Sequence, residues 1–289
     1  MVQYTDIEFY KMSGTGNDFI VIDNREFIIR TCISDFVKAV CTRRVSVGAD
    51  GVILVEPSDK YTIKMRYFNA DGSEGEMCGN GARCICRYAF LKGMAGSKME
   101  IETKSGPIKA EVMDRQVKIR LNPFTKKEFN KKIHTKTGEI SVDYLEQGNP
   151  GLPHAVVYKE HLTFNEDIEK IGREIRTHPL FPKGTNVNFF TIDKGIIFNR
   201  TYERGVEAET LCCGTGAASV AAVCYLKGMS GPQITVKTKG GILHIAMSTD
   251  HSAVYCTGDV IMCYRGVLPS ECISIEKKMK YQKAGEVKK

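Results

Sequence analysis

The chain has 289 residues, 42% of them hydrophobic, which is enough apolar material for one large domain or two of ordinary size. Its formal net charge is +7, but the last thirteen residues carry six lysines against one glutamate and account for +5 of it. The remaining body is nearly neutral, which argues against a nucleic-acid-binding surface, because such a surface needs cations clustered on folded elements.

The eleven cysteines do not form the patterns of a disulfide scaffold or a zinc site, since no paired C-x-x-C units occur with histidine partners. We therefore expect free thiols and no metal. The chain starts without an apolar signal segment and contains no apolar run near the roughly 20 residues of a membrane span. A cytoplasmic protein with reduced thiols is the expectation.

Hydrophobic periodicity and turn residues predict the elements of the first half. In chain order they are strands at 7–12 and 18–24 around a glycine-rich turn ending at Asn17, a helix at 34–43 with Ser34 as N-cap, an antiparallel pair at 51–58 and 61–73, a helix from Cys78 to a C-cap glycine at Gly93, and a strand meander at 99–122.

The second half is predicted to repeat this order. Its elements are a strand at 154–158, a helix at 168–176, strands at 186–193 and 196–205, a helix from the Cys213 turn to Gly228, and strands within 233–248 and 253–268. The alternation typical of a βαβαβ nucleotide-binding domain is missing. We expect an α+β type of α/β fold, in which each half is a curled, mostly antiparallel sheet or barrel around one central helix.

An internal repeat supports two halves. Residues 67–106 align without a gap to residues 202–241, a shift of 135, and fourteen of the forty positions are identical. The alignment pairs Cys78 with Cys213 and Asn69 with Arg204. We expect a first half at 1–122, a second half at 123–268 whose last strand packs on the first, and a solvated basic tail at 269–289.

Each repeated cysteine stands directly before a Gly-x-Gly-Ala turn that opens a helix. Unpaired N–H groups and the helix dipole favour an anion at this place, so they lower the pKa of a thiol from its usual value of about 8.5. The turn glycines, Gly79 and Gly81 in one copy and Gly214 and Gly216 in the other, let the backbone approach a ligand closely. One turn can thus hold a thiolate and bind a substrate carboxylate.

Two such turns suggest a two-base enzyme, in which a thiolate removes a proton from one face of a carbon acid and a thiol returns one to the other face. The two thiols would then be a coupled pair with opposite protonation states. No lysine stands in a Schiff-base setting and neither turn has the spacing of a phosphate loop, so we expect no cofactor. For a single turn, a purely structural cysteine would be the favoured reading; the matched pair favours catalysis.

The segments that carry these residues are KMSGTGNDFIVID, FNADGSEGEMCGNGARC and RTYERGVEAETLCCGTGAAS. They resemble the signature segments of the diaminopimelate epimerase family, and the likeness runs from about residue 8 to residue 268. The resemblance implies two pseudosymmetric α/β halves with the active site between them, a homodimer, a small amino-acid substrate, no cofactor, and no nucleic-acid or membrane partner. It also implies that Cys78 and Cys213 are the acid and base.

The resemblance also assigns substrate-binding roles, with the reacting carboxylate held by the N–H groups of Gly79, Asn80, Gly214 and Thr215. Glu203 would face the ammonium group, and the far carboxylate would be held by Arg204 with Asn17, Asn69, Asn149 and Asn186. Taken alone, Asn17 is equally typical of a turn, Glu203 and Arg204 of a surface ion pair, and Asn149 and Asn186 of structural roles. His154 is expected to be a satisfied structural histidine. Cys212 is rejected as catalytic because the repeat pairs it with Met77.

Two departures from the family pattern alter the expected lining of the site. The family's Gly-Asn-Pro-His occurs here as GNPGLPH, and ERGVEAETLCCG has one residue more than the common form. Three functions therefore stay open. They are diaminopimelate epimerase, acting between the L,L and meso forms for lysine and peptidoglycan synthesis, a racemase of another amino acid such as histidine, and a non-catalytic redox or binding protein.

Overall fold

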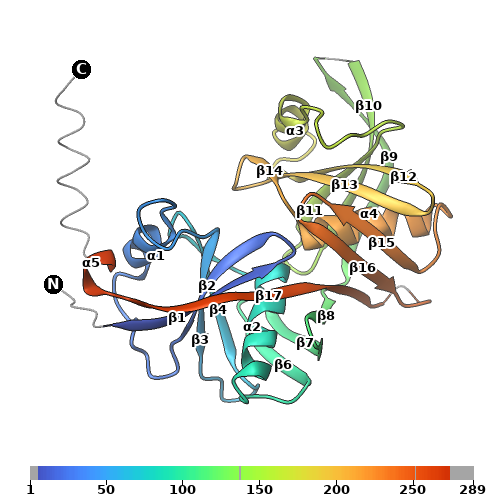
Figure 1. Cartoon of the computed structure of the whole chain (residues 1–289). Helices are drawn as coiled ribbons and strands as arrows, with labels where there is room; N and C mark the ends of the chain where they lie inside the picture. Colours follow the sequence, from blue (N-terminus) through green and yellow to red (C-terminus); the bar gives the residue numbers. More distant parts are fainter. Residues whose placement is uncertain (1–5, 137, 251, 274–289) are drawn as a thin grey trace, which may run out of the picture. The chain divides into compact units, whose positions relative to one another are not determined.

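The structure, a computed structural model, describes residues 6–136, 138–250 and 252–273 (Figure 1). The described chain divides into a first unit, which includes residues 6–14, 18–109 and 260–273, and a second unit, which includes residues 15–17 and 110–259 except 137 and 251. The limits predicted above, 122 and 268, differ from these because β8 (Gln116–Leu121) pairs with the start of strand β17 (Val254–Leu268), whereas the end of β17 pairs with β1 (Ile7–Gly14). The lysines of the basic tail lie outside the described residues.

The first unit is a mixed sheet with two longer helices and a short one. Its elements are β1 (Ile7–Gly14), β2 (Asn17–Asp23), α1 (Ile33–Cys41), β3 (Gly51–Glu56), β4 (Lys64–Asn69), β5 (Glu74–Gly75), α2 (Gly79–Leu91), β6 (Lys98–Thr103), the start of β7 (Gly106–Met113), the end of β17, and α5 (Ser270–Ile273). Strand β1 pairs with β2 and, antiparallel, with β17. Strands β2 and β3 are parallel, and β3 and β4 are antiparallel.

The elements of the second unit are the end of β7, β8 (Gln116–Leu121), β9 (Phe124–Thr135), β10 (Gly138–Gln147), β11 (Leu152–Tyr158), α3 (Glu169–Arg176), β12 (Asn186–Asp193), β13 (Ile196–Glu203), β14 (Ala208–Thr210), α4 (Gly214–Leu226), β15 (Gln233–Thr238), β16 (Gly241–Met247) and the start of β17. From β10 to β16 their order repeats the order from β1 to β7 in the first unit. Helix α4 is almost wholly buried and packs against β10, β11, β12, β13, β15 and β16 (Figure 1). The predicted fold class is confirmed.

The repeat extends to strand register, with one exception. In the parallel pairs Phe19 lies opposite Gly51 and His154 opposite Asn186, which is a shift of 135 for both residues. In the antiparallel pairs Gly51 lies opposite Asn69, whereas Val187 lies opposite Tyr202, so that Asn186 falls opposite Glu203. The counterpart of Asn69 is therefore Glu203, and the predicted pairing of Asn69 with Arg204 is wrong.

The two central helices end in the same way. Gly93 and Gly228 both adopt left-handed φ of 69°. The N–H of Met94 reaches the carbonyl of Ala89 at 2.9 Å, and that of Met229 reaches Cys224 at 2.8 Å. This is the hydrogen-bond pattern of a Schellman motif, in which the glycine follows the cap residue. The predicted ends of both helices are confirmed within two residues.

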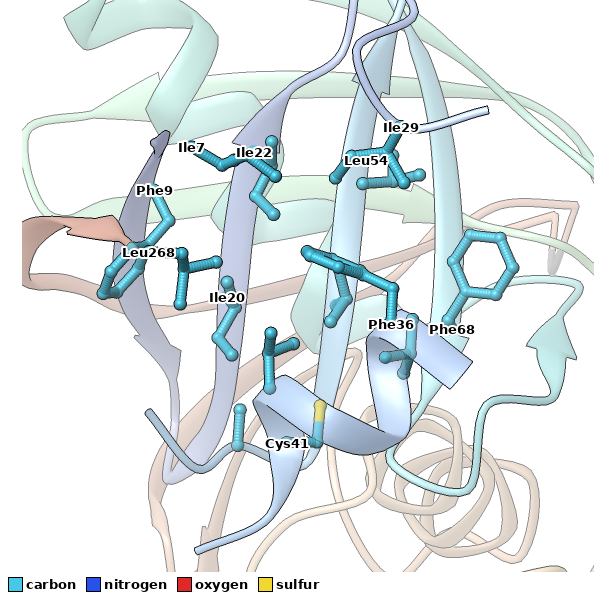
Figure 2. Close-up of a cluster of buried hydrophobic side chains, with 14 residues drawn as sticks. Ile7, Phe9, Ile20, Ile22, Ile29, Phe36, Cys41, Leu54, Phe68 and Leu268 are labelled. Atoms are coloured by element: carbon cyan, nitrogen blue, oxygen red, sulfur yellow. The ribbon is translucent and has the colours of Figure 1, made fainter. Parts of the chain in front are cut away.

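A layer of apolar side chains joins α1 to the sheet of the first unit. Figure 2 shows Phe36 and Cys41 on the helix facing Ile20, Leu54 and other side chains of the strands. The second unit has its own core, which includes Ile175 of α3 with Phe189 and Tyr202 of the sheet. Burial of such side chains supplies most of the stability of each unit, and it fixes the strands from which the two thiol turns emerge.

Two expectations about the elements were wrong. Helix α1 begins at Ile33 after Cys32, which has a left-handed φ of 51°, so Ser34 lies inside the helix and is not its N-cap. The second concerns residues 124–147, for which no strand was predicted and which contain the antiparallel pair of β9 and β10. Strand β9 has one buried residue, Ile133. A strand exposed on both faces has no apolar alternation to reveal it.

Candidate active site

Both predicted catalytic cysteines occupy the N-cap position of a 13-residue helix, Cys78 before α2 and Cys213 before α4. Their backbones are extended, and their carbonyls accept the first helical hydrogen bonds, from Ala82 at 2.8 Å and from Ala217 at 2.9 Å. A side chain at this position faces N–H groups that have no partner within the helix. The predicted placement of both thiols at helix starts is therefore observed in each unit.

The Cys213 thiol caps its own helix. Its Sγ accepts a hydrogen bond from the N–H of Gly216 at 3.4 Å and lies 3.5 Å from Oγ1 of Thr215. Burial raises the pKa of Cys213 well above its ordinary range, the negative charge of Glu203 raises it further, and the two hydrogen bonds oppose both effects. The free protein therefore holds a proton on Cys213 at neutral pH. The helix-start argument alone, which predicts a lowered pKa, was wrong for this residue because it leaves out desolvation.

Glu203 is held beside that thiol by its strand. It is the last residue of β13, and its Oε2 accepts a hydrogen bond of 2.8 Å from the hydroxyl of Thr210 on β14. Thr210 was not among the residues predicted for the site. Its position seven residues from Glu203 becomes informative only when the β13–β14 hairpin is known.

Arg204 and Asn186, both predicted for the far end of the substrate, are brought together. The backbone N–H of Arg204 donates to Oδ1 of Asn186 at 2.8 Å, and Asn186 is buried. The guanidinium of Arg204 donates from Nη1 to the carbonyl of Lys183 at 3.2 Å. One N–H group of the guanidinium is thus held within the second unit, and the group has further N–H donors for an anion.

The predicted residues of the first unit lie at the ends of β4 and α2. Asn69 ends β4, its Oδ1 accepts from the hydroxyl of Tyr67 at 2.6 Å, and its Nδ2 donates to Ser73 at 3.0 Å. Asn80 is buried, and its Oδ1 accepts from Arg83 at 2.8 Å. Because the Asn80 side chain is turned onto its own helix, its backbone N–H is the group suited to a ligand.

Asn17 begins β2 directly after a turn, and Asn149 lies in a turn. The segment 15–17 belongs to the second unit, where the N–H of Thr15 donates to the carbonyl of Asp259 at 3.2 Å. A Cβ on Gly240 would collide with the backbone of Thr15, so this turn needs a glycine beneath it. Asn17 is half-buried and Asn149 is exposed. The second unit thus holds Cys213, Gly214 and Thr215 with Asn17, Asn149, Asn186, Glu203 and Arg204, and the first holds Cys78, Gly79 and Asn80 with Asn69.

The two repeated helix starts rest on opposite kinds of surface. A Cβ on Gly81 of α2 would meet the terminal methyl groups of Met65 at 2.9 Å and Ile53 at 3.1 Å. A Cβ on Gly216 of α4 would collide with Oδ1 of Asn188 and meet Thr201 at 3.2 Å. Ile53 and Asn188 are separated by 135 residues, so equivalent positions are apolar in one unit and polar in the other.

A buried polar network surrounds Asn188. Its Nδ2 lies 3.2 Å from Nδ1 of His154 and donates to the carbonyl of Ala155 at 3.1 Å, while its Oδ1 accepts from Thr201 at 3.0 Å. Burial, with a smaller contribution from the positive charge of Arg204, lowers the pKa of His154 to about 3. His154 is therefore neutral, and within the described residues its Nε2 has no hydrogen-bond partner. The expected fully satisfied histidine is not observed.

Two further features, a metal site and a membrane-spanning helix, were looked for in the described residues. Among them, no three histidine, cysteine, aspartate or glutamate side chains are grouped as a metal ion would require. Across the same part of the chain, no helix is both long and apolar enough to cross a membrane.

Comparison with known proteins gives a consistent result. The family model described as Diaminopimelate epimerase matches residues 9–127 and 147–263. The chain is 42% identical over 273 residues to the diaminopimelate epimerase of Archaeoglobus fulgidus, covering 91% of the chain and 96% of that relative. It is 44% identical over 282 residues to that of Aquifex aeolicus, covering 92% and 99%.

Solved structures at low sequence identity share the fold. A hydroxyproline epimerase from Agrobacterium vitis, crystallised with trans-4-hydroxy-L-proline, superposes with a TM-score of 0.71 at 16% identity, over 92% of this chain and 94% of that one. A PhzF-family phenazine biosynthesis protein from Bacillus anthracis gives 0.69 at 15% identity, over 91% and 99%.

Proposed function

Because the chain belongs to the diaminopimelate epimerase family, we propose that it interconverts L,L- and meso-diaminopimelate, without a cofactor, through the thiols of Cys78 and Cys213. The observation that carries the proposal is the duplication of the thiol turn. Each cysteine occupies the N-cap position of a largely buried helix of equal length, at equivalent places in the repeat. Relatives of this name match almost the whole chain, which favours diaminopimelate over histidine as the substrate.

The proposed reaction needs the two sulfurs on opposite faces of one α-carbon. A thiolate takes the α-proton, so the Cα–H bond breaks and its electron pair passes into the carboxylate. The second thiol then gives its proton to the other face, and the enzyme is left with the two protonation states exchanged. The raised pKa of Cys213 favours its protonated form in the free protein, which suits the thiol that gives a proton to the substrate.

The negative charge that develops on the substrate carboxylate requires preorganised donors. We assign this role to the N–H groups of Gly79, Asn80, Gly214 and Thr215, which lie in the first turns of α2 and α4. The first turn of a helix favours an anion, because its N–H groups point along the helix axis together with the positive end of the helix dipole.

The far end of the substrate carries a second amino-acid group. In the proposal Arg204, with Asn17, Asn69, Asn149 and Asn186, binds the far carboxylate, and Glu203 faces the ammonium side. A guanidinium suits this task because its planar donors match a carboxylate in pairs. The bond between Asn186 and the backbone of Arg204 supports a shared role for these two residues.

We further propose that the protein works in the cytoplasm, in lysine and peptidoglycan synthesis, and as a homodimer. Reducing conditions keep two catalytic thiols free. For a dimer, the support is the exposure of three apolar side chains on β17, with Ile261 51%, Tyr264 48% and Val267 56% exposed. Several exposed apolar side chains on one segment are typical of association surfaces.

Proton NMR in D₂O tests the function directly. Diaminopimelate, histidine and a panel of other amino acids are each incubated with the protein, and the α-proton signal is followed. Loss of the signal for L,L- and meso-diaminopimelate is expected. Exchange of histidine or another amino acid in place of diaminopimelate would support the second reading, and no exchange at all with a fully reduced protein would leave the non-catalytic one.

A further inference from the structure

The extra residue of this chain's ERGVEAET segment lies in the turn that carries Arg204. In the first unit, Phe68 pairs with Glu74 and the N–H of Asn69 reaches the carbonyl of Ser73 at 2.9 Å, so three residues form the turn. In the second unit, Glu203 pairs with Ala208, so four residues, 204–207, form it. The insertion thus lies beside the proposed substrate-binding arginine and not next to the thiol.

The longer turn is closed around Glu207. This residue has a left-handed φ of 59°, and its N–H donates to the carbonyl of Glu203 at 2.9 Å. Its Oε1 accepts from the N–H of Gly205 at 3.0 Å, and its carbonyl accepts from the hydroxyl of Tyr202 at 2.8 Å. A left-handed backbone at a glutamate carries a strain that surrounding contacts must offset.

Arg176 of α3 supplies such contacts. Its Nε donates to Oε1 of Glu207 at 3.1 Å, and its Nη2 donates to the same oxygen at 2.8 Å. Only 18% of the Arg176 side chain is exposed. Burial of Glu207 works against ionisation, but the Gly205 N–H and the Arg176 guanidinium lower the pKa of that carboxyl. The pair is therefore charged across the physiological pH range.

The same arginine also orders the second segment that holds Arg204. Its carbonyl accepts from the N–H of Thr185 at 3.3 Å, and its guanidinium packs so closely on Gly184 that a Cβ there would collide with it. Lys183, the next residue back, provides the carbonyl that binds the Arg204 guanidinium. Arg176 thus contacts both the turn that carries Arg204 and the loop that anchors it.

We propose that Arg176 is a positioning residue that, through Glu207, sets where Arg204 meets the far carboxylate of the substrate. This rests on the proposed function, because only a substrate with a second carboxylate needs Arg204. A partly exposed ion pair contributes little to folding stability. The expected effect of removing it is therefore on substrate binding and not on the fold.

The test compares steady-state kinetics of Arg176→Gln, Glu207→Gln and the double variant with diaminopimelate. Displacement of the charged, two-point contact between Arg204 and the far carboxylate should raise KM about tenfold, which corresponds to about 1.4 kcal/mol of binding free energy. The value of kcat should stay within about twofold. The double variant should resemble either single variant, since both remove the same contact. Arg176→Lys should restore part of the loss.

Arg173→Gln is the matched control. Arg173 lies one turn earlier on α3, and its Nε is 3.4 Å from the Tyr202 hydroxyl, without a bond to the turn itself. Its KM should stay near that of the unaltered protein. An unchanged KM in Arg176→Gln, a fall in kcat instead, or a loss of thermal stability that tracks the loss of activity would overturn the inference. Failure of the unaltered protein to exchange diaminopimelate would instead overturn the proposed function, and the inference with it.

Discussion

Asn69 and Glu203 occupy the same place in the two repeats, each at the end of the strand that leads to a thiol turn. One is neutral and the other carries a negative charge that raises the pKa of Cys213. The repeat is therefore symmetric in backbone and asymmetric in charge. The charge of Glu203 favours a proton on Cys213 in the free protein, and a two-base reaction requires that one thiol hold a proton when the other does not.

Replacing Glu203 by glutamine should make Cys213 easier to ionise. Burial continues to raise the pKa of the thiol, but the repulsion of the neighbouring carboxylate is removed. Alkylation of Cys213 by iodoacetamide, followed by peptide mass spectrometry from pH 6 to 10, should be several times faster near pH 8 than in the unaltered protein. Identical labelling curves would show that Glu203 does not set the charge of this thiol.

The cysteine series tests the choice between neighbouring thiols. Cys78→Ser and Cys213→Ser should each lower epimerisation by at least about 100-fold, because each removes a general acid or base. Cys212→Ser should keep most of the activity, although Cys212 is as buried as its neighbour. Activity measured by α-proton exchange decides the matter. A dead Cys212→Ser beside an active Cys213→Ser would reverse the assignment.

Chemical oxidation offers a test of the proposed distance between the two thiols. Sulfurs that share one carbon should be able to form a disulfide after a modest movement. Mild oxidation should therefore abolish activity, reductant should restore it, and peptide mapping should find Cys78 joined to Cys213. Inactivation with both cysteines still unlinked would argue against a shared substrate carbon.

Two equivalent glycines should differ in their tolerance of alanine. In Gly81→Ala the new methyl meets the flexible ends of Met65 and Ile53, which can shift, so a loss of about 1 kcal/mol or less is expected. In Gly216→Ala it collides with Asn188, which is held by three hydrogen-bond partners, so about 2–3 kcal/mol is expected. Urea denaturation of both variants measures the difference, and equal losses would contradict the contrast between the two helix surfaces.

Much of this organisation could be predicted from the sequence, and the misses have physical causes. Strand β3 is predicted by a continuous apolar run, and helices α2 and α4 are each predicted by a Gly-x-Gly turn directly after a cysteine. Strand β9 gave no such signal because it is exposed on both faces. An ungapped repeat cannot place an inserted residue, so Asn69 was paired with Arg204, one position past its true counterpart.

The polar network around Asn188 was beyond the reach of a single sequence. His154 and Asn188 are 34 residues apart and meet only because β11 and β12 are parallel in one particular register. An asparagine in an otherwise apolar strand was the available signal, since a buried amide must find partners. His154 was expected to be a satisfied structural histidine, whereas within the described residues its Nε2 has no hydrogen-bond partner.

His154 should make the protein sensitive to mild acid. The folded protein holds its pKa at about 3, below the ordinary value of 6.5, chiefly through burial. A depressed folded pKa means that the unfolded chain binds the proton first, so stability is complete above about pH 6.5 and falls steadily as the pH drops toward 3.

His154→Phe, which installs the side chain that Phe19 provides at the equivalent place, removes the titrating group. Urea denaturation at pH 7.5 and pH 5 should show a smaller pH dependence in this variant than in the unaltered protein, and NMR should show no titration of His154 between these values. Equal pH dependence in the two proteins would show that His154 is charged or solvated in the folded state.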